Sequence, residues 1–265
     1  MTERTPRRGP GPGGGRDPRR ARDAARRDQG GRPRSGGHRG EPSAGSSKGY
    51  EAIHLEDDIV KELHGTARPG KGEILVKVFS DAVAAFWAGD LAEAIRLGDQ
   101  SKHMALRAVA VREFLGLAYY HAGRWQDAAR ELATFRRISG SSAQNPVLAD
   151  CYRALERPEK AVELCDEIDV RSVGEAVAYE GAIVAAGALA DLGRIDDAIG
   201  RLEALELSPP TAEEHHLRAW YVLGDLLERR GRFTQARRWF EAVAATDPDA
   251  TDAVDRAARL GAMGG

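Results

Sequence analysis

Apolar and small residues recur along residues 75–248 in blocks that repeat about every 34 positions. Four blocks have a glycine followed five positions later by an alanine, and the middle block keeps only the alanine. A period of this size is typical of stacked helical hairpins. The pattern therefore predicts an all-α array of about five antiparallel helix pairs, with the glycine in the turn because glycine tolerates the left-handed conformation there. The repeated alanines, at steps of 34, 33, 37 and 38 residues, are Ala94, Ala128, Ala161, Ala198 and Ala236.

Capping residues predict where several helices begin. Ser172-x-x-Glu175 and Thr211-x-x-Glu214 have the spacing of a capping box, so each is expected to open the first helix of its hairpin. Asp247-Pro248 predicts the start of a last helix over roughly 248–260. That helix would cap the array, since a terminal repeat needs a soluble outer face.

The third hairpin departs from the pattern. Glu156 stands where the other hairpins have their turn glycine. Asn145-Pro146 has the form of an N-cap followed by proline at the first helical position. The first helix of this hairpin is therefore expected to be short, about 146–156.

A separate helix is predicted before the repeats, because Leu55, Ile59, Val60 and Leu63 recur at helical spacing. A loop over 65–72 is expected to follow it. The predicted organisation is a tail, an N-terminal capping helix with its linker, and a helical repeat domain, over residues 1–49, 50–74 and 75–265.

The second and fifth blocks carry a recognisable motif. The second contains Leu115-Gly116-x-x-Tyr119, Gly123 and Ala128-x-x-x-Leu132, and the fifth contains Trp220-x-x-Leu223-Gly224-x-x-Leu227, Gly231, Ala236-x-x-x-Phe240 and Pro248. This resembles the tetratricopeptide repeat (TPR) family, over residues 75–248. The resemblance implies a right-handed superhelical array whose first helices line a concave groove, with the last helix as a cap. It also implies a non-catalytic adaptor that binds a protein segment in that groove, either an extended peptide or a helix.

The groove positions of the family can be carried onto this sequence. Aromatic anchors beside charged groups suit peptide binding, because rigid rings supply contact area at little entropic cost. The alternative for Phe79 and Phe86 is that they pack against the N-terminal capping helix. The expected groove residues are Phe79, Val83, Phe86, Glu113, Leu117, Tyr120, His121, Asp150, Arg153, Tyr221, Asp225 and Glu228.

Charge divides the chain unevenly. Residues 1–50 hold 13 basic and 5 acidic residues, whereas the remainder holds 26 basic and 36 acidic residues. Residues 1–49 are also rich in glycine and proline and poor in large apolar side chains, which predicts a disordered tail. Three roles are open for such a tail. It could neutralise phosphates and grip RNA or DNA while the repeats recruit a partner. It could instead fold back on the acidic repeats, or it could have no partner. The arginines that would contact nucleic acid are Arg7, Arg8, Arg16, Arg19, Arg20, Arg26, Arg27, Arg32, Arg34 and Arg39.

Catalytic and metal-binding patterns receive little support from the sequence. Residues 65–72 come within one residue of a phosphate-binding loop, but Gly72 replaces the required serine or threonine. His215 and His216 are adjacent, so on a helix they are expected to point about 100° apart and not to share a metal ion. Cys151 and Cys165 are expected to be reduced core residues. We therefore expect no cofactor, no metal and no membrane span, and a cytoplasmic location.

Overall fold

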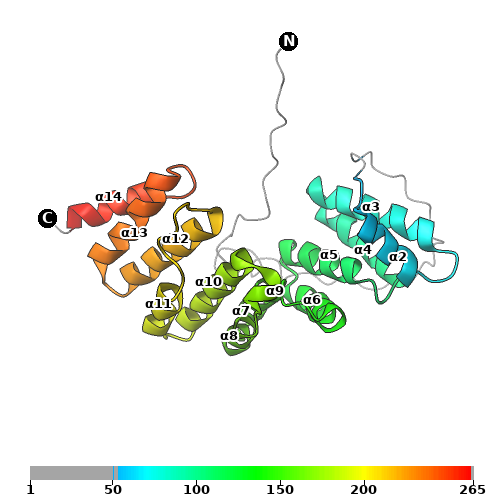
Figure 1. Ribbon diagram of the computed structural model, residues 1–265, viewed down its shortest axis with the longest axis horizontal. Coiled ribbons are helices and arrows are strands. Elements are labelled where there is room, and N and C mark those ends of the chain that lie inside the picture. Colours follow the sequence, from blue (N-terminus) through cyan, green and yellow to red (C-terminus); the bar gives the residue numbers. More distant parts are fainter. Residues whose placement is uncertain (1–49, 51–52, 264–265) are drawn as a thin grey trace, which may run out of the picture. The chain divides into compact units, whose positions relative to one another are not determined.

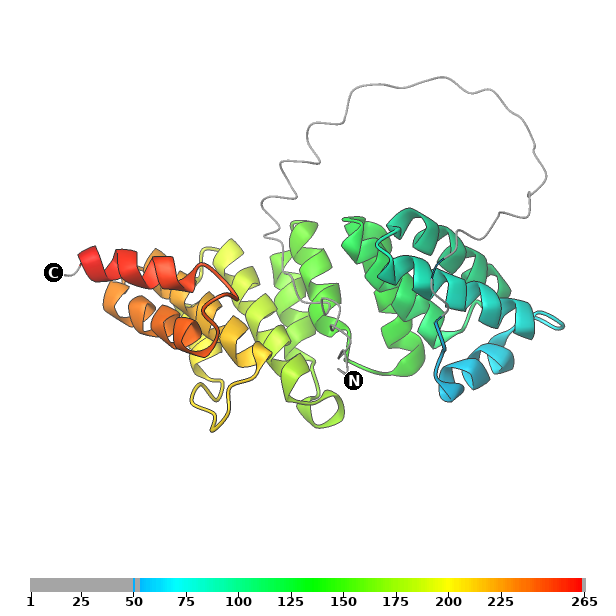
Figure 2. The same cartoon turned by 90° about the horizontal axis from the view of Figure 1, so that it is seen from above.

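The computed structural model describes residue 50 and residues 53–263, so the predicted tail over 1–49 lies outside the described residues. Within them the chain is helical and contains no strand. Figures 1 and 2 show the helices in order along the array. Their bounds are α2 Asp57–Thr66, α3 Gly72–Trp87, α4 Leu91–Met104, α5 Val109–His121, α6 Trp125–Ser139, α7 Asn145–Ala154, α8 Pro158–Asp166, α9 Val170–Val173, α10 Glu175–Asp191, α11 Ile195–Glu203, α12 Glu214–Arg229, α13 Phe233–Thr246 and α14 Ala253–Met263.

Five helical hairpins make up the array, as the repeat pattern predicts: α3/α4, α5/α6, α7/α8, α10/α11 and α12/α13. The first helices contact one another in succession, from α3 through α5, α7 and α10 to α12. Each of the second helices α4, α6, α8 and α11 also packs against the first helix of the next hairpin. The first helices therefore form one continuous layer, which we call the first-helix layer (Figure 1).

The turn inside each hairpin has a residue with positive φ. Four of these are the repeated glycines, such as Gly123 with φ 70° and Gly231 with φ 82°. In the third hairpin Glu156 has φ 61°, and it is the one non-glycine residue with positive φ in the described part of the chain. The third turn thus keeps the geometry of the others despite a side chain that disfavours it.

Small residues allow the two helices of a hairpin to approach closely. The repeated alanines are fully buried, Ala128 and Ala236 among them. A Cβ atom placed on Gly116 would lie 2.3 Å from Leu132 Cδ2, and one on Gly224 would lie 2.9 Å from Phe240 Cε1. The glycine of the Leu-Gly motif is therefore required by packing across the hairpin.

Helix α2 covers the start of the array, packing against α3 and α5. Leu63 is fully buried there, and the Glu62 carboxylate accepts hydrogen bonds from the backbone N–H groups of Val109 and Ala110 at the start of α5. The following loop is shorter than expected, since α2 continues to Thr66 and α3 already begins at Gly72. None of the helices in the described residues has the length and apolar character needed to cross a membrane.

Both predicted capping boxes are wrong. Ser172 lies inside the one-turn helix α9, where its hydroxyl donates to the Asp169 carbonyl, and Gly174 precedes α10. Helix α12 begins at Glu214 after Glu213, so Thr211 is too early to cap it. The backbone N–H of Glu213 instead donates to His216 Nδ1 at 3.0 Å.

Helix α7 is short, as predicted, and begins one residue before the expected position, but the capping role predicted for Asn145 is wrong. Asn145 is the first residue of α7, and its buried side chain donates to the Leu164 carbonyl at 2.8 Å. The last helix begins at Ala253 rather than at residue 248. Residues 247–252 form a turn in which the hydroxyl of Thr251 accepts from the Ala253 N–H, and this turn delays the helix.

Replacing Glu156 with glycine is expected to stabilise the protein by roughly 0.5–1 kcal/mol, because the left-handed conformation costs an ordinary residue about 1–2 kcal/mol. Urea unfolding followed by circular dichroism measures the change. Ala133→Gly, on the exposed face of α6, is the control and should lose about 1 kcal/mol. Equal destabilisation by both substitutions would contradict the assigned role of Glu156.

Replacing Gly116 with alanine is expected to cost about 1–3 kcal/mol, since the new methyl group overlaps Leu132. Gly200→Ala is the matched control on α11, because no atom lies within 4 Å of the position its Cβ would take. That substitution should gain up to about 1 kcal/mol from helix propensity alone. A neutral result for Gly116→Ala would show that the helices can separate without loss.

Candidate protein-binding surface

An aromatic cluster forms the N-terminal part of the first-helix layer. Phe114 of α5 packs edge-to-face on both Phe79 and Phe86 of α3, with ring centroids 5.4 Å and 5.9 Å apart. His121 contacts Phe86 at 5.3 Å and Tyr120 at 5.8 Å. The cluster joins the first two repeats through their first helices.

Exposure differs among the predicted residues of this region. Phe79 is 3% exposed and belongs to the same buried cluster as Leu63 of α2, so it is a core residue. Val83, Phe86 and Leu117 are half-buried, whereas His121 is exposed. The set predicted from the sequence therefore contains both core and surface residues.

Trp87 is a surface residue that the sequence prediction missed. It is 60% exposed, and its ring lies edge-to-face on Phe86 at 5.9 Å. A tryptophan one residue before the C-cap of α3, next to a predicted groove residue, was the available signal. Trp87 extends the aromatic cluster outwards from the helix layer.

A line of polar contacts crosses the second, third and fourth repeats. The Tyr120 hydroxyl donates to Asp150 Oδ2 at 2.8 Å, and Arg153 binds Asp150 Oδ1 at 3.0 Å. Arg153 also reaches Asp191 at the end of α10, at 3.1 Å. Burial, together with the neighbouring Asp150 carboxylate, raises the pKa of Tyr120 well above its ordinary value. Glu113 lies beside this line and accepts from Gln144 Nε2 at 2.8 Å.

The predicted residues of the fifth repeat face helix α14. The Arg256 guanidinium lies 2.9 Å from Asp225 Oδ1 and 2.6 Å from Glu228 Oε2, and it stacks 4.2 Å from the centre of the Phe240 ring. The Tyr221 hydroxyl donates to Asp252 at 2.6 Å. Burial alone would raise the pKa of Glu228, but the hydrogen bonds and charge of Arg256 hold it below its ordinary value. This part of the layer is engaged by the chain's own last helix.

The other candidates from the sequence, residues 65–72 and the two cysteines, lie where they have structural rather than chemical roles. Residues 65–72 span the end of α2, a turn and the start of α3, which is not the strand-to-helix setting of a phosphate-binding loop. Cys151 and Cys165 are buried free thiols, as predicted, and burial raises the pKa of Cys165 to about 12. Neither thiol is placed for surface chemistry.

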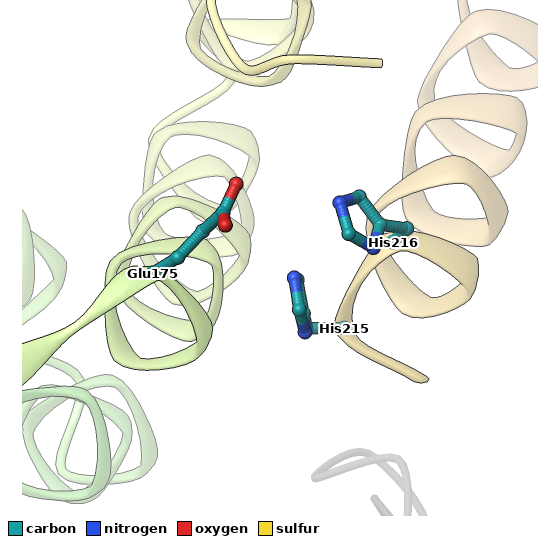
Figure 3. A group of neighbouring side chains, drawn as sticks. All are labelled: Glu175, His215 and His216. Atoms are coloured by element: carbon teal, nitrogen blue, oxygen red, sulfur yellow. The ribbon is translucent and has the colours of Figure 1, made fainter. Parts of the chain in front are cut away.

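The prediction that His215 and His216 diverge is wrong. Their ring centroids are 4.0 Å apart at the start of α12. With Glu175 they form a group whose potential ligand atoms all lie within 4.8 Å of one another, and Figure 3 shows the Glu175 carboxylate facing both rings. The expected 100° divergence holds for ideal side-chain directions, whereas here both rings turn onto Tyr179, with ring centroids 4.7 Å and 4.9 Å away.

The packing defines a helical-repeat scaffold, a class whose helix layers present extended surfaces for binding. Residues 183–251 match the model of the tetratricopeptide repeat family. That segment belongs to the family, and the array as a whole has the fold of tetratricopeptide repeat proteins. The comparison with curated proteins gives no match.

Solved structures of tetratricopeptide repeat proteins share this fold at low sequence identity. A TPR-like repeat protein described as a putative kinesin light chain of Podosopora anserina is 20% identical, with a TM-score of 0.56, and the match covers 68% of this chain and 97% of that one. The thermophilic TPR protein TTC0263 of Thermus thermophilus is 18% identical, with a TM-score of 0.52 and coverage of 70% and 98%. MamA is 17% identical, with a TM-score of 0.52 and coverage of 67% and 93%.

Proposed function

We propose that this protein is a non-catalytic adaptor that binds a segment of another protein on the first-helix layer of its first four repeats. The observation that carries the proposal is the exposed Trp87 beside the half-buried Phe86 and the exposed His121. A large exposed aromatic ring supported by other rings is the kind of anchor that dominates binding energy in protein interfaces.

Next to the aromatic cluster, the proposed binding surface has a line of polar contacts from Tyr120 through Asp150 and Arg153 to Asp191, which we call the polar line. Asp150 and Arg153 are largely shielded and satisfied by each other, by Tyr120 and by Asp191. Such a pre-organised set can orient a bound backbone or polar side chain at little ordering cost. We propose that the partner segment places an apolar side chain on the rings and polar groups along this line.

The predicted groove residues of the fifth repeat are less accessible to a partner. Tyr221, Asp225 and Glu228 stay predicted groove residues, but a partner would have to displace Arg256 to reach them. Removing a guanidinium from two carboxylates and an aromatic face is costly. The first four repeats are therefore the better docking surface.

Charge favours a particular kind of partner. The sequence after residue 50 holds 36 acidic and 26 basic residues, which creates a negative field around the repeats. We propose that the partner segment carries basic residues beside its apolar anchor, and that the encounter takes place in the cytoplasm. The nucleic-acid alternative depends on the arginines of residues 1–49, outside the described part of the chain, and it stays a prediction.

The test compares two exposed aromatic residues on different helix layers. Partners are captured from native lysate, with and without nuclease, by the full-length protein, by a variant lacking residues 1–49, by Trp87→Ala and by Phe233→Ala. The affinity for the recovered partner is then measured. Trp87→Ala should weaken binding by tenfold or more, about 1.4 kcal/mol, as expected for an interface anchor. Phe233→Ala, which removes a 43% exposed ring from α13, should leave the affinity unchanged.

Two results would contradict the proposal. Equal affinity of the Trp87→Ala and Phe233→Ala variants would place the partner elsewhere on the protein. Recovery that is abolished by nuclease, and by deletion of residues 1–49, would favour the nucleic-acid alternative. Circular dichroism of each variant checks that the repeats remain folded.

A further inference from the structure

We propose that Glu175, His215 and His216 form a binding site for a divalent transition-metal ion of the zinc type. Glu175 is the first residue of α10, and the two histidines lie in the first turn of α12. One potential ligand atom from each residue lies within 4.8 Å of those from the other two. Figure 3 shows the carboxylate and the rings converging from the two helices.

Unpartnered nitrogen atoms are the observation that points to a ligand. His215 is 9% exposed and His216 is 4% exposed. Each has a buried Nε2 atom without a hydrogen-bond partner among the described residues. Buried polar atoms are normally satisfied, and two adjacent exceptions beside a carboxylate require an explanation. A metal ion between the three side chains supplies it.

The surrounding contacts hold the rings in place. Tyr179 packs edge-to-face on both imidazoles, and its hydroxyl donates to the Glu206 carbonyl at 2.5 Å. His216 also lies near Trp220, whose Nε1 donates to the Leu207 carbonyl at 3.1 Å. The site is therefore supported by α10, by the connection before α12 and by α12 itself.

Proton positions decide how each histidine would bind. Glu213 Oε2 lies 3.7 Å from His215 Nδ1, so the carboxylate favours a proton on Nδ1 and a lone pair on Nε2. His216 Nδ1 accepts from the Glu213 N–H, so the neutral ring carries its proton on Nε2. Metal binding would move that proton to Nδ1 and free the Glu213 N–H, which belongs to an exposed residue, to bond water. Glu175 and His215 are thus the principal ligands, and His216 is the weaker third.

Ligand chemistry and local charge select the ion. Two imidazole nitrogens and one carboxylate oxygen suit zinc, and three protein ligands leave a position for water. Glu175 brings a negative charge to the site as a ligand, and a second carboxylate, that of Glu213, lies 3.7 Å from His215 Nδ1. This charge favours a cation. A bound ion would connect the first turn of α10 to that of α12 and so fix the fourth repeat against the fifth.

The test uses the full-length chain without an affinity tag, stripped of metal by a chelator. Titration with Zn²⁺ by calorimetry and with Co²⁺ by visible absorption should show one equivalent bound, and Zn²⁺ should raise the unfolding temperature. Glu175→Gln and His215→Gln should each weaken binding at least tenfold. Glu175 is exposed, so its substitution removes a ligand without opening the core.

Two controls separate this site from other side chains. Glu214→Gln removes a neighbouring exposed carboxylate, and His103→Gln removes an exposed histidine from α4, and both should bind Zn²⁺ as the unchanged protein does. Long-range ¹⁵N spectra should show the His216 proton on Nδ1 only with Zn²⁺ present, together with a shift of the Glu213 amide signal. Absence of stoichiometric binding, or unchanged affinity in Glu175→Gln and His215→Gln, would overturn the proposal.

Discussion

The close approach of two helices at small residues is the constraint on which the rest of this array depends. Each hairpin brings an alanine of its second helix, such as Ala128 or Ala236, into a fully buried position against the first helix. In the second and fifth hairpins a glycine of the first helix leaves room for Leu132 or Phe240. Because each repeat contacts mainly its neighbours, this local fit sets how far apart successive helices lie, and it is repeated along the chain.

Packing between repeats is less uniform than packing within them. The first two repeats are joined by Glu131, which is 1% exposed and is paired with Lys102 at 3.1 Å and Arg112 at 2.6 Å. Helix α10 has buried alanines on several of its faces. Two clusters of buried hydrophobic residues each include residues of this helix. A helix that is apolar around most of its circumference needs neighbours on all sides, and α10 contacts α7, α8, α11 and α12. The fourth repeat thus connects the two halves of the core.

The period of glycines and alanines predicted the hairpins correctly because both residues act through local requirements: positive φ in the turn and small volume at the crossing. Helix starts were less predictable, because Ser172 and Asn145 are used by contacts that depend on the folded arrangement, the turn at α9 and the Leu164 carbonyl. The same limit applies to the candidate sites. The line from Tyr120 to Asp150 joins predicted residues, whereas the engagement of Glu228 by Arg256 depends on where the turn over 247–252 places α14. The convergence of His215 and His216 follows from their shared contact with Tyr179, which adjacency in the sequence could not indicate.

The third repeat shows why the polar line matters to the fold as well as to binding. This repeat has a left-handed Glu156, an unpartnered Asn145 Oδ1 and two short helices, all of which lower its intrinsic stability. Arg153 of this repeat lies against Gly187 of α10, where a Cβ atom would come within 2.6 Å of its guanidinium carbon, and pairs with Asp191. Asp150 pairs with Tyr120 of the repeat before. This hairpin is therefore held from both sides through the same groups that the proposed partner would contact. A partner that competed with these bonds would loosen the array, whereas a partner that added to them would stiffen it.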